Sequence, residues 1–89
     1  MKIEPWRLEF KPGWDENFAK FDRSVQLKIL KKFEQMKNPL LGRGLHSSSY
    51  KVEEVGSYRI VYEEDGTAMA KHVHFVGTHK QYERWYLGR

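Results

Sequence analysis

The fold is decided by residues 50–62, which read Tyr-Lys-Val-Glu-Glu-Val-Gly-Ser-Tyr-Arg-Ile-Val-Tyr. Apolar and charged side chains follow a period of two in residues 50–53 and again in residues 58–62, and Gly56-Ser57 stands between the two runs. A period of two is typical of a half-buried strand, and a glycine-containing pair is typical of a tight hairpin turn. Residues 50–62 therefore predict two neighbouring antiparallel strands.

The same pattern extends the predicted sheet on both sides. Asp65-Gly66 predicts a second two-residue turn, and residues 69–76 predict a third antiparallel strand of the same meander. Near the start of the chain, residues 3–10 alternate apolar and charged side chains but contain Pro5, which cannot donate a ladder hydrogen bond and suits an edge strand. We expect four strands, with residues 3–10 at one edge.

Helical spacing occupies the remaining stretches. Trp14, Phe18 and Phe21 follow Pro12-Gly13 at i, i+4 and i+7, and predict a short helix. A second apolar stripe over residues 25–36 predicts a longer helix that ends before Asn38-Pro39, with residues 42–44 as a flexible connector. Residues 79–87 predict a terminal helix. The expected fold class is α+β, in the order β-α-α-β-β-β-α, with an antiparallel-rich twisted sheet and an antiparallel helical pair on one face.

Length and charge limit the possible classes of protein. The 89 residues suffice for one domain, which we expect to span residues 1–89, and the absence of cysteine excludes a disulfide scaffold and a thiolate metal site. No stretch is apolar enough to cross a bilayer or to act as a signal peptide, so we expect a cytoplasmic protein. The net charge is 16 − 12 = +4, which suggests an anionic partner such as nucleic acid.

Candidate functional side chains lie on the predicted strands. Lys51 and Glu53 share one strand face, Arg59 shares a face with Val61, and His72 shares a face with His74, while the register between strands cannot be read. Such residues suit cleavage of RNA by its 2′-hydroxyl, a reaction that needs a base, an acid and fixed cations near the phosphate. From composition alone, the simpler interpretation of Lys51 and Arg59 is that they are solvent-facing strand residues. His72-x-His74 has the form of two metal ligands, although nothing fixes a third, and surface histidines are the simpler interpretation.

Four segments together resemble a known family. They are Asn38-Pro39-Leu40 to Gly44, Tyr50-Lys51-Val52-Glu53, Gly56-Ser57-Tyr58-Arg59-Ile60-Val61-Tyr62, and Val76-Gly77-Thr78-His79-Lys80-Gln81-Tyr82-Glu83. In this order they resemble the RelE/ParE superfamily of type II toxins over essentially the whole chain. The ending from Thr78 to Glu83 is similar to that of HigB-type mRNA interferases.

The resemblance implies a ribosome-dependent endoribonuclease that cuts messenger RNA, leaves a 2′,3′-cyclic phosphate, uses no metal or cofactor, and is held inactive by a cognate antitoxin. Arg59 matches the arginine that steadies the scissile phosphate, and Lys51 matches the first lysine of a Lys-x-Lys strand. His79 matches a proton-transfer histidine, Tyr82 matches a tyrosine that stacks or orients a base, and Lys80 or Arg84 would contact the RNA backbone. Glu53 stands where the second strand lysine is expected, which leaves the general base open between Glu53 and His79.

Two alternatives belong to other classes of function. ParE-type members of the superfamily inhibit DNA gyrase, here through the helical pair, although His79 favours the ribonuclease branch. A degenerate member would only bind an antitoxin, which typically wraps its toxin with a helix or adds a strand at a sheet edge such as residues 3–10. The lysines of the second helix, Lys28, Lys31 and Lys32, would face either ribosomal RNA or the antitoxin.

Overall fold

The computed structural model describes residues 5–38, 43–44 and 50–88, and its elements follow the expected order except that the first helix is shortened and a short strand is added after the second. They are β1 (Arg7–Phe10), a 3-10 helix η1 (Phe18–Lys20), α1 (Arg23–Met36), β2 (Arg43–Gly44), β3 (Tyr50–Val55), β4 (Tyr58–Asp65), β5 (Ala70–Thr78) and α2 (His79–Leu87). The strands form one sheet in the order β1-β5-β4-β3-β2. All described pairings are antiparallel except that of the edge strand β1 with β5, which is parallel. The predicted α+β class, the meander and the terminal helix are confirmed.

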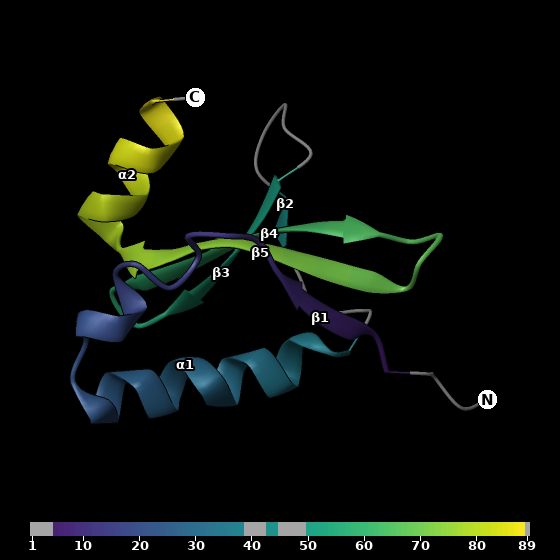
Figure 1. Ribbon diagram of the computed structural model, residues 1–89, viewed down its shortest axis with the longest axis horizontal. Helices are drawn as coiled ribbons and strands as arrows, with labels where there is room; N and C mark the ends of the chain where they lie inside the picture. The colour runs from purple at the N-terminus through teal and green to yellow at the C-terminus, as the bar shows by residue number, and fades with distance from the viewer. Residues whose placement is uncertain (1–4, 39–42, 45–49, 89) are drawn as a thin grey trace.

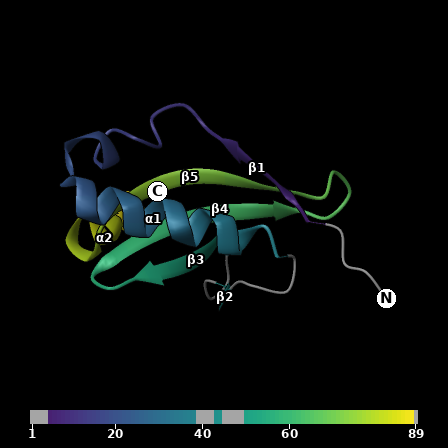
Figure 2. The same ribbon diagram turned by 90° about the horizontal axis from the view of Figure 1, so that it is seen from below.

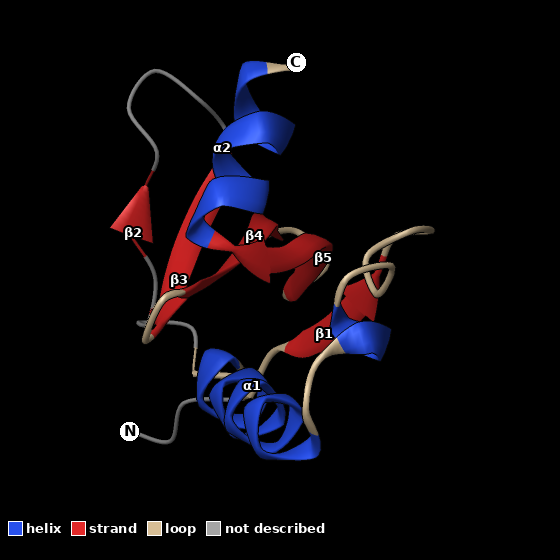
Figure 3. Cartoon of the chain, turned by 90° about the vertical axis from the view of Figure 1, so that its left-hand side faces the viewer, coloured by secondary structure: helices blue, strands red, loops and turns tan. Residues whose placement is uncertain are grey.

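The sheet separates the two helices. Figure 1 shows α1 below the sheet and α2 above it, and Figure 3 shows the same arrangement from the side. Seen from the α1 side in Figure 2, α1 lies across the central strands. We call the two sides of the sheet the α1 face and the α2 face. No described helix is long and apolar enough to cross a membrane.

The hydrophobic core lies on the α1 face. Ile29, Phe33 and Met36 recur at helical spacing on α1 and are buried against the sheet. Their partners are the α1-face residues of β4 and β5, namely Ile60, Tyr62, Val73 and Val76. The expected stripe on the second helix is therefore the core-facing stripe, and it fixes which strand residues point toward α1.

Three local expectations are wrong. The predicted first helix is reduced to η1, because residues 12–17 form turns and only Phe18–Lys20 are helical, so that one α-helix covers the α1 face instead of a pair. Asp65-Gly66 is not a two-residue hairpin turn: β5 begins only at Ala70, and Asp65 Oδ1 accepts hydrogen bonds from the backbone N–H groups of Thr67 and Ala68 at 3.1 Å each. The Asp65 side chain builds its own turn, which lengthens the loop. Arg43–Gly44 pair with β3 as β2, whereas Gly42 lies outside the described residues.

The hairpin between β3 and β4 turns as predicted. Gly56 has φ +58° at the first turn position, where the tight II′ turn requires a positive φ. Thr78, the last residue of β5, is the N-cap of α2 and forms a capping box. The Gln81 N–H donates to Thr78 Oγ1 at 3.2 Å, and the Thr78 N–H donates to Gln81 Oε1 at 2.8 Å. These two features lie next to each other at one end of the sheet, where Tyr58 is paired with Thr78.

Gly77 has no room for a side chain, which gives a first prediction. A Cβ at this position would lie 2.6 Å from Cζ of Phe75, whose ring is buried and stacks on Trp85 of α2. Gly77→Ala is expected to displace that ring and to lower the free energy of unfolding by about 1–3 kcal/mol, as overpacking does. Urea denaturation measures the change, with Gly66→Ala, which meets nothing within 4 Å, as the control. An equal, small effect of both substitutions would contradict the packing described for Gly77.

Candidate functional site

The Gly56–Ser57 turn brings two of the predicted site residues together on the α2 face. Arg59 Nη1 donates hydrogen bonds to the carbonyl oxygens of Gly56 at 3.0 Å and Tyr58 at 2.9 Å. The backbone N–H of His79 donates to the carbonyl oxygen of Ser57 at 2.9 Å. Arg59 and His79 are thus anchored to consecutive carbonyl groups of one turn, although they are 20 positions apart in the chain. We call Arg59, His79 and Tyr82 the turn site.

Arg59 is the cation of this site. Its side chain is only 17% exposed, and Nη2 lies 3.7 Å from Oε2 of Glu54, the residue opposite it on β3. A guanidinium presents several N–H donors in a planar fork that matches phosphate oxygens. Partial burial strengthens such contacts by removing competing water. Arg59 is thus a largely buried cation whose Nη1 is held by two backbone carbonyl oxygens and whose Nη2 lies beside Glu54.

His79 begins α2 and is accompanied by a carboxylate. Its Nε2 lies 2.6 Å from Oε1 of Glu83, one helical turn later, and the two side chains are 51% and 54% exposed. The ring centroid of His79 lies 6.2 Å from that of Tyr82. Two contacts fix the backbone of His79. The capping box holds the first turn of α2, and the N–H of His79 is bonded to the carbonyl oxygen of Ser57. Sequence reasoning missed Glu83, although the i, i+4 spacing on a predicted helix was a usable signal.

Tyr82 completes the turn site between His79 and Tyr86. Burial raises the pKa of its phenol, the neighbouring Tyr86 and Glu83 add to the rise, and Arg59 opposes it. The influence of Arg59 places the phenol within electrostatic range of the guanidinium. A phenol is protonated near neutral pH at its ordinary pKa of about 10, and the rise keeps Tyr82 so, which lets it donate a hydrogen bond.

Lys51 and Glu53 share one strand face, as expected, but it is not the face of Arg59. Residue 54, not residue 53 or 51, is opposite Arg59 in the β3–β4 register, so the alternation of the strand turns Lys51 and Glu53 to the α1 face. Lys51 Nζ pairs with Oε1 of Glu64 at 2.6 Å, and Glu53, 9% exposed, lies 3.7 Å from Nζ of Lys32 on α1. Both residues are engaged in ion pairs under α1, on the opposite side of the sheet from the turn site.

These two ion pairs border a fully buried lysine. Lys71 on β5 is 0% exposed. Its Nζ donates a hydrogen bond of 3.0 Å to the carbonyl oxygen of Asn38, which follows α1, and the same Nζ lies 5.4 Å from the ring centroid of Tyr62. Burial lowers the pKa of the Lys71 ammonium, while Glu64 and Glu53 partly oppose that shift. Burial likewise raises the pKa of Tyr62, with Glu53 and Glu64 adding to the rise. This cluster stabilises the end of α1 and is a structural feature that the sequence did not reveal.

The lowered pKa of Lys71 makes a second prediction, about pH. Because the unfolded chain binds the Lys71 proton more tightly than the folded chain, the stability contributed by this residue rises as pH rises toward the ordinary lysine pKa. Lys71→Met keeps the length of the side chain and removes its titration. The free energy of unfolding should be measured for the wild type and for Lys71→Met between pH 7 and pH 10. The value for the wild type minus the value for Lys71→Met should increase as pH rises. A difference that stays constant or moves the other way would contradict the burial of a charged Lys71.

His72 and His74 also face the α2 side, farther along β5. A bulge between β4 and β5 leaves His74 without a ladder partner, since Tyr62 is opposite Val73 and Val61 is opposite Phe75. His74 Nε2 lies 2.7 Å from Oε1 of Glu63, and its ring meets the edge of Tyr50 with centroids 5.2 Å apart. His72 Nδ1 lies 3.6 Å from Oε1 of Glu9. Each histidine thus faces its own glutamate, and within residues 5–38, 43–44 and 50–88 no three potential metal ligands gather.

The basic residues predicted to contact RNA fall into two groups. Lys80 and Arg84 are exposed on α2, the helix that carries His79 and Tyr82. Lys28 and Lys31 are exposed on α1, whereas Lys32 is held against Glu53. Only the first group shares an element with the turn site.

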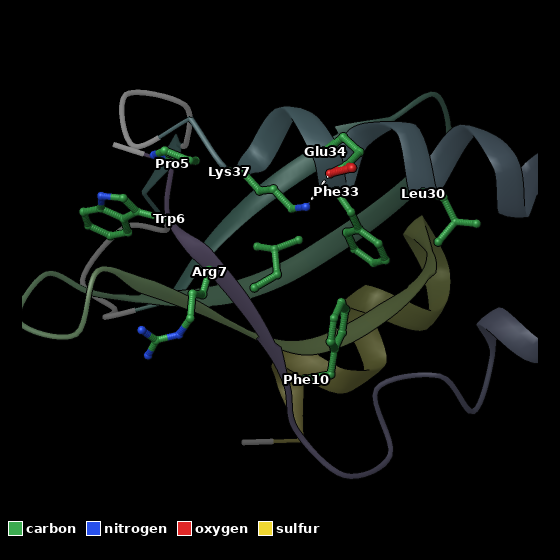
Figure 4. Close-up of a pocket in the computed structure, with 9 residues that line it drawn as sticks. Pro5, Trp6, Arg7, Phe10, Leu30, Phe33, Glu34 and Lys37 are labelled. Atoms are coloured by element: carbon green, nitrogen blue, oxygen red, sulfur yellow. Dashed lines mark ion pairs between the residues drawn. The ribbon is translucent and has the colours of Figure 1, made fainter. Parts of the chain in front are cut away.

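A separate groove lies between the edge strand β1 and α1. Its volume is about 710 Å³, and apolar side chains from both elements line most of it, as Figure 4 shows for Trp6, Phe10, Leu30 and Phe33. Phe10 and Leu30 are among the most exposed large apolar residues described. The groove belongs to the α1 side of the molecule and is remote from the turn site.

Comparison with solved structures identifies the fold as that of RelE toxins. A chain of the toxin–antitoxin complex RelBE2 from Mycobacterium tuberculosis is 17% identical and has a TM-score of 0.75, with 86% of this chain and 94% of that chain covered. An arginine double mutant of Escherichia coli toxin RelE in the free state is 20% identical with a TM-score of 0.73, and 92% of each chain is covered. The archaeal RelE–RelB complex from Pyrococcus horikoshii OT3 gives 10% identity, a TM-score of 0.68, and coverage of 83% and 94%. No protein-family model and no curated protein sequence matches the chain.

Proposed function

We propose that this protein is the toxin of a toxin–antitoxin system and cleaves messenger RNA on the ribosome. The observation that carries the proposal is the anchoring of Arg59 and His79 to the same Gly56–Ser57 turn. Arg59 would be the phosphate-binding cation and His79 the proton-transfer group, and the shared turn brings both to one end of a RelE-like sheet. The neighbouring solved structures are RelE toxins and toxin–antitoxin complexes, which supports the same class of function.

The proposed reaction is attack of the RNA 2′-hydroxyl on the adjacent phosphorus. Arg59 binds the nonbridging phosphate oxygens, where negative charge grows in the transition state. His79 transfers a proton, the role that imidazole fills most often. The phenol of Tyr82 donates a hydrogen bond to, or stacks against, the nucleotide beside the scissile bond, while Lys80 and Arg84 on α2 contact the backbone. The reaction proposed for these residues needs no metal or other cofactor.

The third prediction tests this function in cells. Primer extension on messenger RNA from cells that make the protein should show cuts inside translated codons, and His79→Ala should reduce them about a hundredfold and restore growth. The low end of the range for acid–base catalysis applies because His79 is half exposed to water. His72→Ala, which removes a histidine far from the turn, is the matched control and should leave the cuts unchanged. Intact messenger together with impaired gyrase supercoiling would instead favour the ParE-type activity, and an inactive wild type would favour a degenerate toxin.

The proposed partner is an antitoxin that occupies the groove between β1 and α1. Exposed apolar side chains in that groove fit an apolar segment, and the excess of lysine on α1 favours an acidic one. A short acidic protein encoded beside this chain, when produced together with it, should copurify and suppress the cuts. Leu30→Glu, placed in the groove, should weaken that suppression. Suppression that is insensitive to Leu30→Glu would show that the antitoxin binds elsewhere.

A further inference from the structure

We infer that Glu83 holds His79 in the tautomer that acts as the general base of the proposed cleavage. The inference rests on the proposed function for its chemistry, but not for the tautomer itself. It starts from the 2.6 Å contact between Glu83 Oε1 and His79 Nε2, one helical turn apart on α2. An ionised carboxylate can only accept hydrogen bonds, so Nε2 must carry the proton of the neutral ring. The lone pair is then on Nδ1.

The position of His79 makes this carboxylate necessary. His79 is the first residue of α2, where the unpaired N–H groups of the helix disfavour a positive charge. A general base becomes an imidazolium when it takes a proton, and that cation would form at an unfavourable position. Glu83 supplies a compensating negative charge within hydrogen-bond distance, in the same way that a carboxylate orients and stabilises the histidine of a catalytic triad.

The structure also removes the competing base. Glu53 lies on the α1 face, is 9% exposed and pairs with Lys32, so it cannot reach a phosphate bound by Arg59 on the α2 face. The side-chain contacts of His79 are with Glu83, at 2.6 Å, and with Tyr82, whose ring centroid lies 6.2 Å away. Glu54 also lies on the α2 face, where it is paired with the Arg59 guanidinium at 3.7 Å. Of the two candidate bases, Glu53 and His79, only His79 lies on this face, and Glu83 is its positioning residue.

The proposed step is attack of the RNA 2′-hydroxyl on the neighbouring phosphorus. The 2′-hydroxyl gives its proton to His79 Nδ1 while the 2′-oxygen forms a bond to phosphorus. The bond between phosphorus and the 5′-oxygen breaks, and this oxygen takes a proton from solvent water. The imidazolium then returns its proton to solvent. The products are a 2′,3′-cyclic phosphate and a 5′-hydroxyl end.

Nitrogen-15 NMR of the imidazole rings in the purified, full-length protein tests the tautomer without any RNA. At a pH where the ring is neutral, His79, assigned by its absence from the spectrum of His79→Ala, should show a protonated Nε2 and an unprotonated Nδ1. Glu83→Ala should shift it toward a mixture of the two tautomers. A protonated Nδ1 in the wild type, or no change in Glu83→Ala, would overturn the inference.

Cleavage kinetics on programmed ribosomes test the consequence. Glu83→Gln should lower kcat about tenfold with little change in KM. Loss of an orienting partner typically costs about 10- to 100-fold, and the low end of that range applies because this pair is half exposed. The same substitution should have no further effect in a His79→Ala background, since the two residues act as a unit. Glu9→Gln, which alters a carboxylate facing the outer histidine His72, is the matched control and should leave kcat unchanged. An active wild type with a fully active Glu83→Gln would overturn this inference alone, whereas an inactive wild type would overturn the proposed function.

Discussion

Arg59→Ala is expected to lower the rate of messenger cleavage by a factor on the order of 10²–10³, the loss typical of removing one fixed donor to a developing negative charge. Arg59 is the cation of the turn site, its side chain is largely shielded from water, and its Nη1 donates to the Gly56 and Tyr58 carbonyl oxygens. The substitution removes both the charge and its orientation. The measurement is a single-turnover cleavage rate on ribosomes programmed with a defined message.

Two further variants separate chemistry from folding in this experiment. Arg59→Lys keeps the charge but loses the planar fork, and should retain an intermediate rate. Arg23→Ala removes an exposed arginine at the start of α1, on the opposite face of the sheet, and should cleave at the wild-type rate. A wild-type rate for Arg59→Ala would contradict the role assigned to the turn site.

Phe33→Ala is expected to have the largest effect on stability, lowering the free energy of unfolding by about 3–5 kcal/mol. Phe33 is buried in the core between α1 and the sheet, and its ring meets the edges of Phe10 and Trp14 at centroid distances of 5.3 Å and 5.7 Å. Small domains have a total stability of roughly 5–15 kcal/mol, so such a loss is a large fraction of the whole. Urea denaturation followed by circular dichroism measures it.

Leu27→Ala on the same helix is the control for this prediction. Leu27 is 52% exposed on the outer side of α1, where substitutions usually change stability by about 0.5 kcal/mol or less. The ratio of the two effects therefore reports which side of α1 packs on the sheet. Equal losses for Phe33→Ala and Leu27→Ala would contradict the core described for the α1 face.

The elements with strong periodicity were predictable from the sequence. The 3.6-residue stripe of α1, the two-residue period of β4 and the boundaries of α2 each follow from local pattern, and the tight turn at Gly56 follows from glycine chemistry. The first helix was not predictable. Trp14 lies in a turn and packs against Phe18 and Phe33, although Trp14 and Phe18 have the spacing of a helix. Tertiary packing outweighed the local helical spacing.

The candidate site was only partly predictable, because its geometry depends on strand register. Arg59 and His79 were identified by motif, and the two-residue length of the Gly56–Ser57 turn sets Glu54 opposite Arg59. The sequence does not show the bulge between Val61 and Tyr62, which changes the register of β5 against β4 and so decides which β5 side chains share the face of Arg59. For the same reason the burial of Lys71, which depends on α1 and on the neighbouring strands, left no trace in the sequence pattern.

The central claim is that the chemistry occurs at the turn site on the α2 face, and not at Lys51 and Glu53 under α1. The most direct test compares the cleavage rates of Arg59→Ala and Lys51→Ala on the same programmed ribosomes. We expect Arg59→Ala to lose on the order of 10²–10³ in rate, and Lys51→Ala, whose partner Glu64 is on the α1 face, to stay within about threefold of the wild type. A Lys51→Ala variant as impaired as Arg59→Ala, with its fold intact, would contradict the account.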